Sequence, residues 1–198
     1  MTSPTSFIKR KAGASLLHSP RTAQAHGRPL NTFVTINLWQ FGITPRNAAE
    51  VFQQLRQRHF QTWSRYKPRG SKETRNGPPT YAWVIEAPNR RVHCHWAVHI
   101  RPNQLDDFEK KLPKWLLRLT GESYVPSRAI DIIENTRPEG TKLYMAKGLD
   151  RSLAAMWNIR PVDSGTIIGR RAGTSRNLGP SEWQPRKEEW RRMRRAAA

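Results

Sequence analysis

The segment from residue 80 to residue 100 constrains the fold of this chain more than any other. The stretches "TYAWVIEA" (80–87) and "RVHCHWAVHI" (91–100) are rich in β-branched and aromatic residues, as strands are, and the short connection between them predicts a hairpin. Side chains alternate between the two faces of a strand. One face of the second strand is apolar and consists of Val92, Cys94, Trp96, Val98 and Ile100. The opposite face carries His93, His95, Ala97 and His99.

The register of this hairpin predicts a carboxylate beside the histidines. For an even-numbered loop centred between Asn89 and Arg90, partners are equally distant from that centre, which pairs Glu86 with His93 and Val84 with His95. Opposed residues have Cβ atoms about 4.5–5.5 Å apart. Two imidazoles and a carboxylate suit Mn²⁺, Mg²⁺, Zn²⁺ or Fe²⁺. The structural alternatives are an ordinary exposed strand face and an ion pair between Glu86 and Arg91.

The rest of the chain predicts an α+β fold. Strands are expected at 31–40, 127–135 and 165–171, and helices at 45–66, 102–121 and 141–157. Thr44 and Pro45 should begin the first helix, and Gly121 should end the second, which Pro113 bends. Hairpin connections in the middle of the chain favour a central antiparallel sheet of about four to five strands with helices packed on it.

Both ends of the chain are expected to lie outside the folded domain. Residues 1–30 lack an apolar period and predict a flexible basic arm, with an organelle transit peptide as the alternative. The domain should span 31–170, and 171–198 should form a basic tail of marginal helicity. Cys94 is the only cysteine, which excludes an intrachain disulfide and suits a reducing cytoplasm. No window approaches the roughly 18–20 apolar residues of a membrane span, so a soluble protein without a membrane partner is expected.

The charge of the chain indicates a polyanionic partner. Lys and Arg outnumber Asp and Glu by 35 to 15, for a net charge of +20, which favours nucleic acid. The turn-rich segment 67–80 is expected to form a mobile basic flap. The residues expected to contact phosphate groups in this flap and after residue 169 are Arg69, Lys72, Arg75, Arg170, Arg171 and Arg176. Trp183 and Trp190 are candidates for stacking on bases.

A second polar cluster lies on the helix predicted at 141–157. At about 100° per residue, Tyr144, Lys147 and Arg151 share one stripe. The opposite stripe is apolar and consists of Ala146, Leu149, Leu153, Met156 and Trp157. A tyrosine with a lysine one turn on can present a phenolic nucleophile beside a cation that stabilises phosphate charge. The structural alternative is an ordinary amphipathic helix with a surface tyrosine.

Taken in order, these segments resemble the three successive motifs of the HUH endonucleases, in the single-tyrosine branch of rolling-circle replication initiators (Rep proteins). The matching segments are "FVTINL" (33–38), "HCH" (93–95) with Glu86 before it, and Y-x-x-K as "YMAK" (144–147). The resemblance spans residues 33 to about 157 and implies an HUH/ferredoxin-like two-layer sandwich. In the relaxase branch the tyrosine precedes the histidines, so the order here disfavours a relaxase. "FVTINL" has no carboxylate to act as an extra ligand, and Asn37 is the residue that can replace one.

The resemblance implies a sequence-specific endonuclease and strand-transferase that nicks single-stranded or hairpin origin DNA and starts rolling-circle replication of a plasmid or phage in the bacterial cytoplasm. His93, His95 and Glu86 would bind Mn²⁺ or Mg²⁺. Tyr144 would attack the scissile phosphate to give a 5′-phosphotyrosine, and Lys147 would position or neutralise that phosphate. Arg151 would contact DNA. The chain has no Walker A loop, so a host helicase would unwind the DNA. The alternatives are a single-strand transposase and a non-catalytic nucleic-acid-binding protein.

Overall fold

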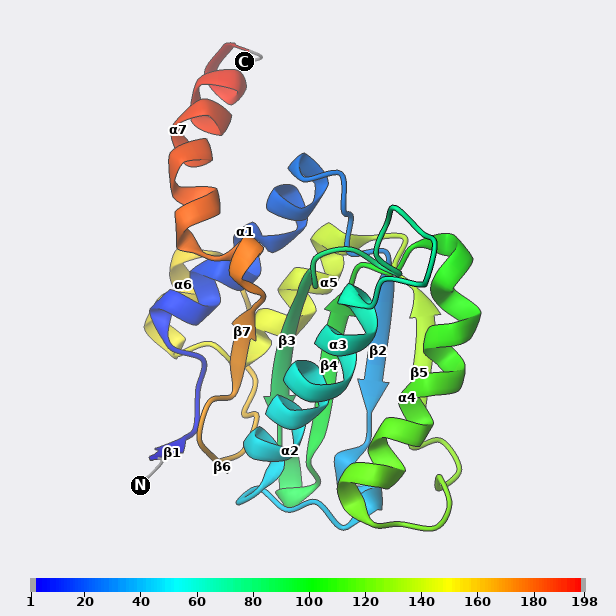
Figure 1. Ribbon diagram of the computed structural model, residues 1–198. Coiled ribbons are helices and arrows are strands. Elements are labelled where there is room, and N and C mark those ends of the chain that lie inside the picture. The colour runs from blue at the N-terminus through cyan, green and yellow to red at the C-terminus, as the bar shows by residue number, and fades with distance from the viewer. Residues whose placement is uncertain (1–2, 197–198) are drawn as a thin grey trace.

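The computed structural model describes residues 3–196, whose elements are labelled in Figure 1. The strands are β1 (Pro4–Thr5), β2 (Thr32–Ile36), β3 (Tyr81–Glu86), β4 (His93–Val98), β5 (Ile130–Glu134), β6 (Ile167–Ile168) and β7 (Ala172–Thr174). The α-helices are α1 (Arg10–Ala25), α2 (Ala48–Gln54), α3 (Gln61–Arg65), α4 (Leu105–Thr120), α5 (Pro138–Met145), α6 (Arg151–Met156) and α7 (Pro180–Ala196). A π-helix, η2 (Leu55–Phe60), joins α2 to α3. The 3-10 turns are η1 (Leu38–Phe41), η3 (Pro88–Arg90), η4 (Pro102–Gln104), η5 (Ala146–Gly148) and η6 (Arg176–Leu178).

The centre of the fold is a five-stranded antiparallel sheet in the order β5, β2, β4, β3, β7. This confirms the predicted α+β class. In the β3–β4 hairpin Glu86 lies opposite His93 and Val84 opposite His95, as the sequence predicts. Of the strand predicted at 165–171, only Ile167–Ile168 form a strand, which is β6. It pairs with β1 in a separate two-stranded sheet.

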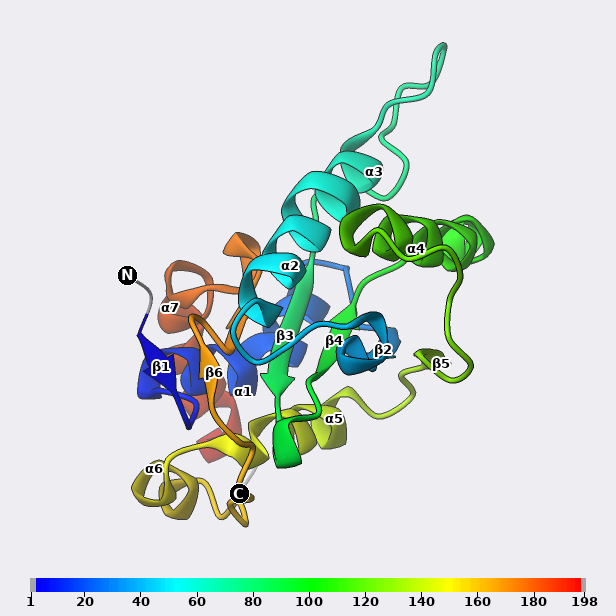
Figure 2. The ribbon, with the colours of Figure 1, turned by 90° about the horizontal axis from the view of Figure 1, so that it is seen from below.

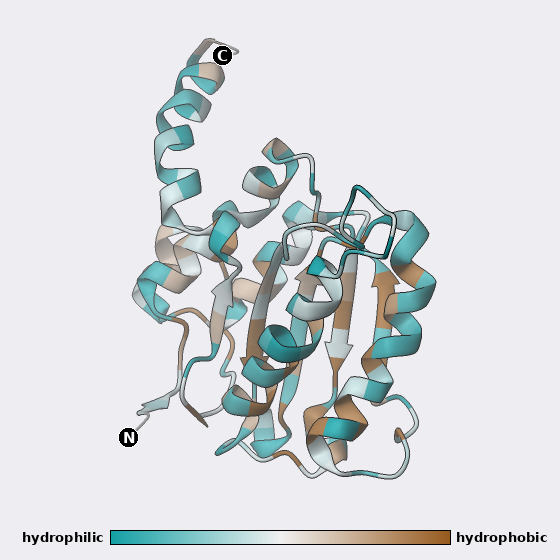
Figure 3. Cartoon of the chain, in the orientation of Figure 1, coloured by the Kyte–Doolittle hydropathy of each residue, from teal (hydrophilic) through white to brown (hydrophobic). Residues whose placement is uncertain are grey.

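An aromatic core fills one face of the sheet, beneath α2, α3 and α4 (Figures 1 and 2). Trp96 is fully buried there, and its ring centroid lies 4.8 Å from that of Phe60 and 5.6 Å from that of Phe52. Figure 3 shows apolar colour on the strands and hydrophilic colour on the outer side of the covering helices. Among the helices of residues 3–196, none has both the length and the apolar character needed to cross a bilayer.

The boundaries of two predicted helices depend on their caps. Thr44 and Pro45 precede α2 rather than beginning it, because the Thr44 hydroxyl donates a hydrogen bond to the Asn47 side chain (3.0 Å) and Asn47 is the N-cap. Gly121 ends α4 in the left-handed conformation, with φ at 76°, as predicted. Pro113 lies inside α4.

Helix α1 occupies the region where the sequence predicts a flexible arm. It covers the second face of the sheet together with α5 (Figure 2). Its buried residues are mostly small or hydroxyl-bearing, with Leu16 and Pro20 as the larger apolar ones, so its apolar stripe is weak. Gly13 allows the Leu149 side chain to approach the helix backbone, because a Cβ at this position would overlap it. Ser19 and Thr22 are buried with their hydroxyls donating to the carbonyls of Leu16 and His18, which removes the cost of burying them.

The predicted basic tail is also folded. Strand β7 pairs with β3 at the edge of the sheet, and α7 runs away from the body of the protein (Figure 1). The His18 ring of α1 stacks on Trp183 and Trp190 of α7, with centroid distances of 4.3 and 5.9 Å. Trp183 is buried by this packing, so the prediction that it stacks on bases is wrong.

The contact between α1 and α7 should depend on pH through His18. Burial, together with nearby cations such as Lys187 and Lys142, lowers the pKa of His18 from 6.5 to about 4. A group whose pKa is lowered by folding contributes stability above its unfolded pKa, and this contribution is lost as the pH falls towards the folded value. We therefore expect the melting temperature to fall more steeply between pH 6.5 and 4 in the wild type than in His18→Phe. Equal pH dependence in thermal melts would contradict this expectation.

Candidate functional site

Glu86, His93 and His95 converge on the sheet face opposite the aromatic core. Glu86 ends β3 and His93 begins β4, and the intervening loop turns through Asn89 and Arg90, which have positive φ values of 51° and 63°. The three ligand atoms that the residues offer all lie within 4.8 Å of one another. The hairpin therefore brings together the imidazoles and carboxylate that its register predicts, in a group that can hold a metal ion.

Glu86 is the electrostatic centre of this group. Its side chain is 2% exposed, and its Oε2 atom lies 3.1 Å from His93 Nε2 and 3.0 Å from Lys147 Nζ. Burial alone would raise the pKa of Glu86, but hydrogen bonds from His93, His95 and Lys147 outweigh it and hold the pKa well below its usual range. The alternative ion pair with Arg91 is not formed, because the Arg91 guanidinium lies over the Trp39 ring, 5.1 Å from its centroid.

His95 is oriented by contacts on both of its ring nitrogens. Nδ1 lies 3.2 Å from the Thr35 hydroxyl, and Nε2 lies 3.7 Å from Glu86 Oε2 and 3.2 Å from the Tyr144 hydroxyl. Burial lowers the pKa of His95, which favours the neutral imidazole that binds metal ions. A hydrogen bond on one ring nitrogen commonly directs the other towards a metal. The donor set, its convergence and the protonation state therefore fit a divalent cation.

Helix α5 presents Tyr144 to this group. The Tyr144 ring packs edge-on against Phe33 and His95, with centroid distances of 6.3 and 5.0 Å. Its side chain is nevertheless 45% exposed. Lys147 Nζ lies 4.0 Å from the centroid of the Tyr144 ring. A partly exposed tyrosine thus lies beside the candidate metal ligands and has a cation next to it.

The predicted helix 141–157 is interrupted, which separates Arg151 from the tyrosine and the lysine. Helix α5 ends at Met145, and Leu149 has extended backbone angles. Asp150 then caps a new helix, its carboxylate accepting from the Ser152 N–H at 3.0 Å. Arg151 is exposed at the start of α6, so the prediction of a stripe shared by Tyr144, Lys147 and Arg151 fails at its last member.

The other basic residues selected from sequence divide into free and structural ones. Arg69 and Lys72 are exposed on the loop between α3 and β3, which projects from the molecule in Figure 2. Arg75 instead holds this loop to the body: its Nη1 atom lies 3.3 Å from Asp107 Oδ2, and its guanidinium lies 4.9 Å from the centroid of the Tyr66 ring. Arg170, Arg171 and Arg176 lie around a separate cavity beside β7.

Two further residues belong to the site and are not among those predicted from the sequence. Thr35 lies directly opposite His95 in β2, and the alternation of "FVTINL" contains the signal that places it on the imidazole face. Ser164, whose hydroxyl lies 3.5 Å from Glu86 Oε1, comes from an irregular segment without such a signal. The expectation that Asn37 enters the site is wrong, because its side chain donates to the Arg128 carbonyl at 2.7 Å.

We compared the chain with protein-family models, with curated proteins and with solved structures, and none of the three comparisons gave a match.

Proposed function

We propose that the protein is a metal-dependent endonuclease that nicks single-stranded DNA and rejoins strands through a covalent bond to Tyr144. The observation that carries this proposal is the contact of 3.2 Å between the Tyr144 hydroxyl and His95 Nε2. It joins the hydroxyl of the motif "YMAK" to the group of Glu86, His93 and His95. The order of these segments, which resembles that of Rep-type HUH endonucleases, supports the same conclusion.

The metal ligands and the tyrosine would have different roles in the reaction. Glu86, His93 and His95 would hold Mn²⁺ or Mg²⁺, which when bound would polarise a phosphate oxygen and offset charge in the transition state. The hairpin positions these ligands, and α5 positions the phenol. The ligands and the phenol therefore come from different elements of the fold.

The proposed reaction is a transesterification that needs no further co-reactant. The Tyr144 oxygen forms a bond to phosphorus as the bond from phosphorus to the 3′ oxygen of the preceding nucleotide breaks. The phenol loses its proton to solvent, and the departing 3′ oxygen takes one up. The product is a 5′-phosphotyrosine beside a free 3′-hydroxyl. Because one phosphodiester replaces another, attack by a 3′-hydroxyl can reverse the step and transfer the strand.

Lys147 would supply positive charge during this step. Burial would lower the pKa of its ammonium, but the hydrogen bond and charge of Glu86 raise it above its usual value. The ammonium therefore stays charged at neutral pH. It lies between the Glu86 carboxylate and the Tyr144 ring, where it can neutralise charge on the phosphate or on the phenolate.

The substrate and its setting follow from the same proposal. The net charge of +20 supports a nucleic-acid partner, and exposed Arg69 and Lys72 are available for phosphate contacts. The DNA would be a single-stranded or hairpin origin of a plasmid or phage that replicates by the rolling-circle mechanism. The protein would act in the bacterial cytoplasm with a host helicase.

The proposal predicts a metal-dependent covalent adduct. Wild-type protein incubated with Mn²⁺ and a pool of single-stranded oligonucleotides of random sequence should retain a label placed at the 3′ end on a denaturing gel. A label at the 5′ end should be released instead, because a 5′-phosphotyrosine keeps the downstream fragment. EDTA should abolish the adduct while salt-sensitive binding persists. Binding without an adduct, with pooled or hairpin DNA, would favour a non-catalytic nucleic-acid-binding protein.

A further inference from the structure

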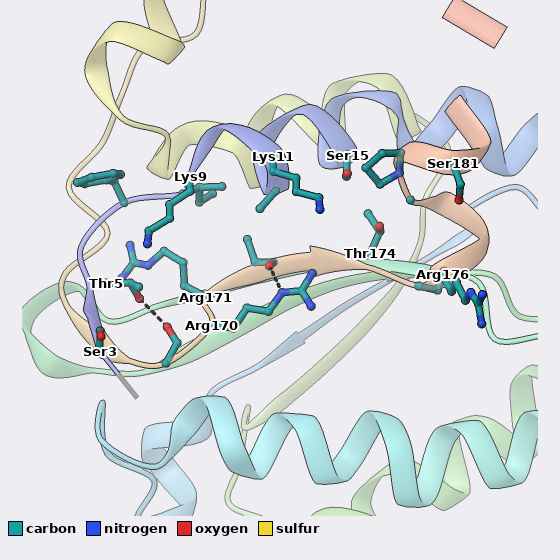
Figure 4. Close-up of a pocket in the computed structure, with 18 residues that line it drawn as sticks. Ser3, Thr5, Lys9, Lys11, Ser15, Arg170, Arg171, Thr174, Arg176 and Ser181 are labelled. Atoms are coloured by element: carbon teal, nitrogen blue, oxygen red, sulfur yellow. Dashed lines mark hydrogen bonds between the residues drawn. The ribbon is translucent and has the colours of Figure 1, made fainter. Parts of the chain in front are cut away.

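A cavity of about 680 Å³ lies beside the edge strand β7, between that strand, β1 and the first turns of α1 (Figure 4). Of the candidate metal ligands, His93 and His95 lie two strands away on β4, and Glu86 lies at the end of the neighbouring strand β3. The volume of the cavity is within the range of roughly 300–1,000 Å³ that is typical of small-molecule sites. None of the residues proposed for nicking contributes to its walls within the described part of the chain. It is therefore a separate candidate site.

The walls of the cavity are cationic. Its charged side chains are Lys9, Lys11, Arg170, Arg171 and Arg176, and no Asp or Glu lines it among residues 3–196. In Figure 4, Lys9 and Lys11 extend from the α1 side towards the arginines of the β7 side. Such a concentration of positive charge is costly without a counter-charge. An anionic ligand would supply one.

Two arginines of the cavity wall are held in place by hydrogen bonds to backbone carbonyls. Arg171 is 3% exposed, and it donates from Nη1 to the Ser6 carbonyl at 2.9 Å, while its buried Nε has no partner among the described residues. Arg170 donates from Nε to the Ala172 carbonyl at 3.0 Å, the bond drawn in Figure 4. Glycine at 173 leaves room for this conformation, because a Cβ there would overlap the Arg170 guanidinium. Fixed guanidinium groups lose little entropy when they bind phosphate.

The start of α1 adds to the anionic preference. Lys9 is its N-cap residue, no side chain caps the helix, and its first turn contains no acidic residue. The positive end of the helix dipole and its uncapped N–H groups are favourable for a phosphate. Lys9, Lys11 and Ala12 all line the cavity, so this end of the helix borders it.

The remaining walls combine hydroxyl residues with apolar ones, among them an exposed aromatic ring. Phe7 is 46% exposed and lines the cavity together with Ile8, Ala172 and Pro180. Aromatic side chains stack on the faces of bases irrespective of sequence. A ligand that combines a phosphate with a flat, weakly polar ring is a nucleotide.

We propose that this cavity binds one nucleotide unit, with its phosphate on the lysines and arginines and its base against Phe7. The unit can be a free nucleotide or one residue of a single-stranded DNA, since the chemistry recognised is the same. The site uses no residue of the metal centre, so the proposal does not rest on the nuclease function.

Calorimetric titration with dAMP in the presence of EDTA tests the proposal. The double variant Lys11→Gln with Arg176→Gln removes two exposed cations of the cavity and should weaken dAMP binding at least about tenfold, because each removes a charge-assisted hydrogen bond. Its matched control is Lys114→Gln with Arg118→Gln, an equal loss of exposed charge on α4. The control should bind dAMP as the wild type does. Phe7→Ala should weaken dAMP binding but leave the binding of inorganic phosphate unchanged.

The outcomes separate the possible ligands. Displacement of dAMP by a short oligothymidylate supports a unit of DNA as the occupant, and dAMP binding without displacement supports a free nucleotide. Equal weakening in the α4 control would show non-specific charge attraction and overturn the proposal, as would inorganic phosphate binding as tightly as dAMP. Absence of dAMP binding would also overturn it. Because no divalent ion is present, none of these results depends on nicking by Tyr144.

Discussion

Tyr144→Phe is expected to abolish the covalent protein–DNA adduct and to lower the nicking rate at least about a thousandfold, or about 4 kcal/mol of transition-state stabilisation. The substitution removes the attacking oxygen but keeps the ring that packs against Phe33 and His95. The fold loses one hydrogen bond, worth about 1 kcal/mol. DNA affinity, measured by fluorescence anisotropy at several salt concentrations, should change little. The adduct and the binding curve are therefore expected to respond differently to one substitution.

The matched control for this substitution is Tyr124→Phe. Tyr124 is 68% exposed and lies between α4 and β5, so the loss of its hydroxyl should affect neither adduct nor binding. A tryptic digest of the wild-type adduct adds a direct assignment. Cleavage after Lys142 and Lys147 releases a peptide of residues 143–147, which should carry the nucleotide. An adduct on Tyr144→Phe, or on another peptide, would refute the proposed nucleophile.

Glu86→Gln should have the second largest effect, because it removes the only carboxylate of the metal group in the described chain. We expect the affinity for Mn²⁺ to fall at least about a hundredfold and nicking to be lost with it. Calorimetry measures the affinity directly. A second readout is thermal: Mn²⁺ at 100 times its wild-type Kd should stabilise the wild type by about 2.7 kcal/mol and the variant by no more than about 0.4 kcal/mol.

The control for this variant is Glu134→Gln, which replaces an exposed carboxylate in β5 of the same sheet. It should bind Mn²⁺ as the wild type does. Without metal, Glu86→Gln should also cost about 1–3 kcal/mol of stability, because the ion pair with Lys147 is lost. The pKa of Glu86 is lowered by folding from its ordinary value of 4.5. Its contribution is therefore present above that value and is lost as the pH falls through the folded pKa, so the stability difference should shrink in acid. An unchanged affinity for Mn²⁺ would remove Glu86 from the metal centre.

The hairpin shows how much of the site can be predicted from sequence. Strand alternation and the position of the turn are enough to bring Glu86 to His93 and to place His95 on the same face, because the period of a strand leaves no other choice for a given register. The same reasoning applies to Thr35. Which residue of β4 lies opposite Thr35 depends on how β2 pairs with β4. A long connection separates these two strands, so the sequence does not specify their register.

The predictions from sequence fail where tertiary packing or a helix cap overrides the hydrophobic pattern. Helix α1 buries Leu16, but its contact also depends on Gly13, Ser19 and Thr22, which are buried through close approach and local hydrogen bonds rather than through apolar area. No hydrophobic period marks such a face. In contrast, Asp150 is a common N-cap residue, and its position before Arg151 could have indicated a second helix.

The pairing of β7 with β3 has a consequence for biosynthesis. Strand β3 has β4 as one neighbour, but its other edge is completed only by residues 172–174, and the helix against which α1 packs follows at 180–196. Until residues 172–174 have left the ribosome, β3 carries an unpaired edge of the kind that associates with other chains. Between the synthesis of β3 and that of β7, this edge is therefore open to pairing with other chains.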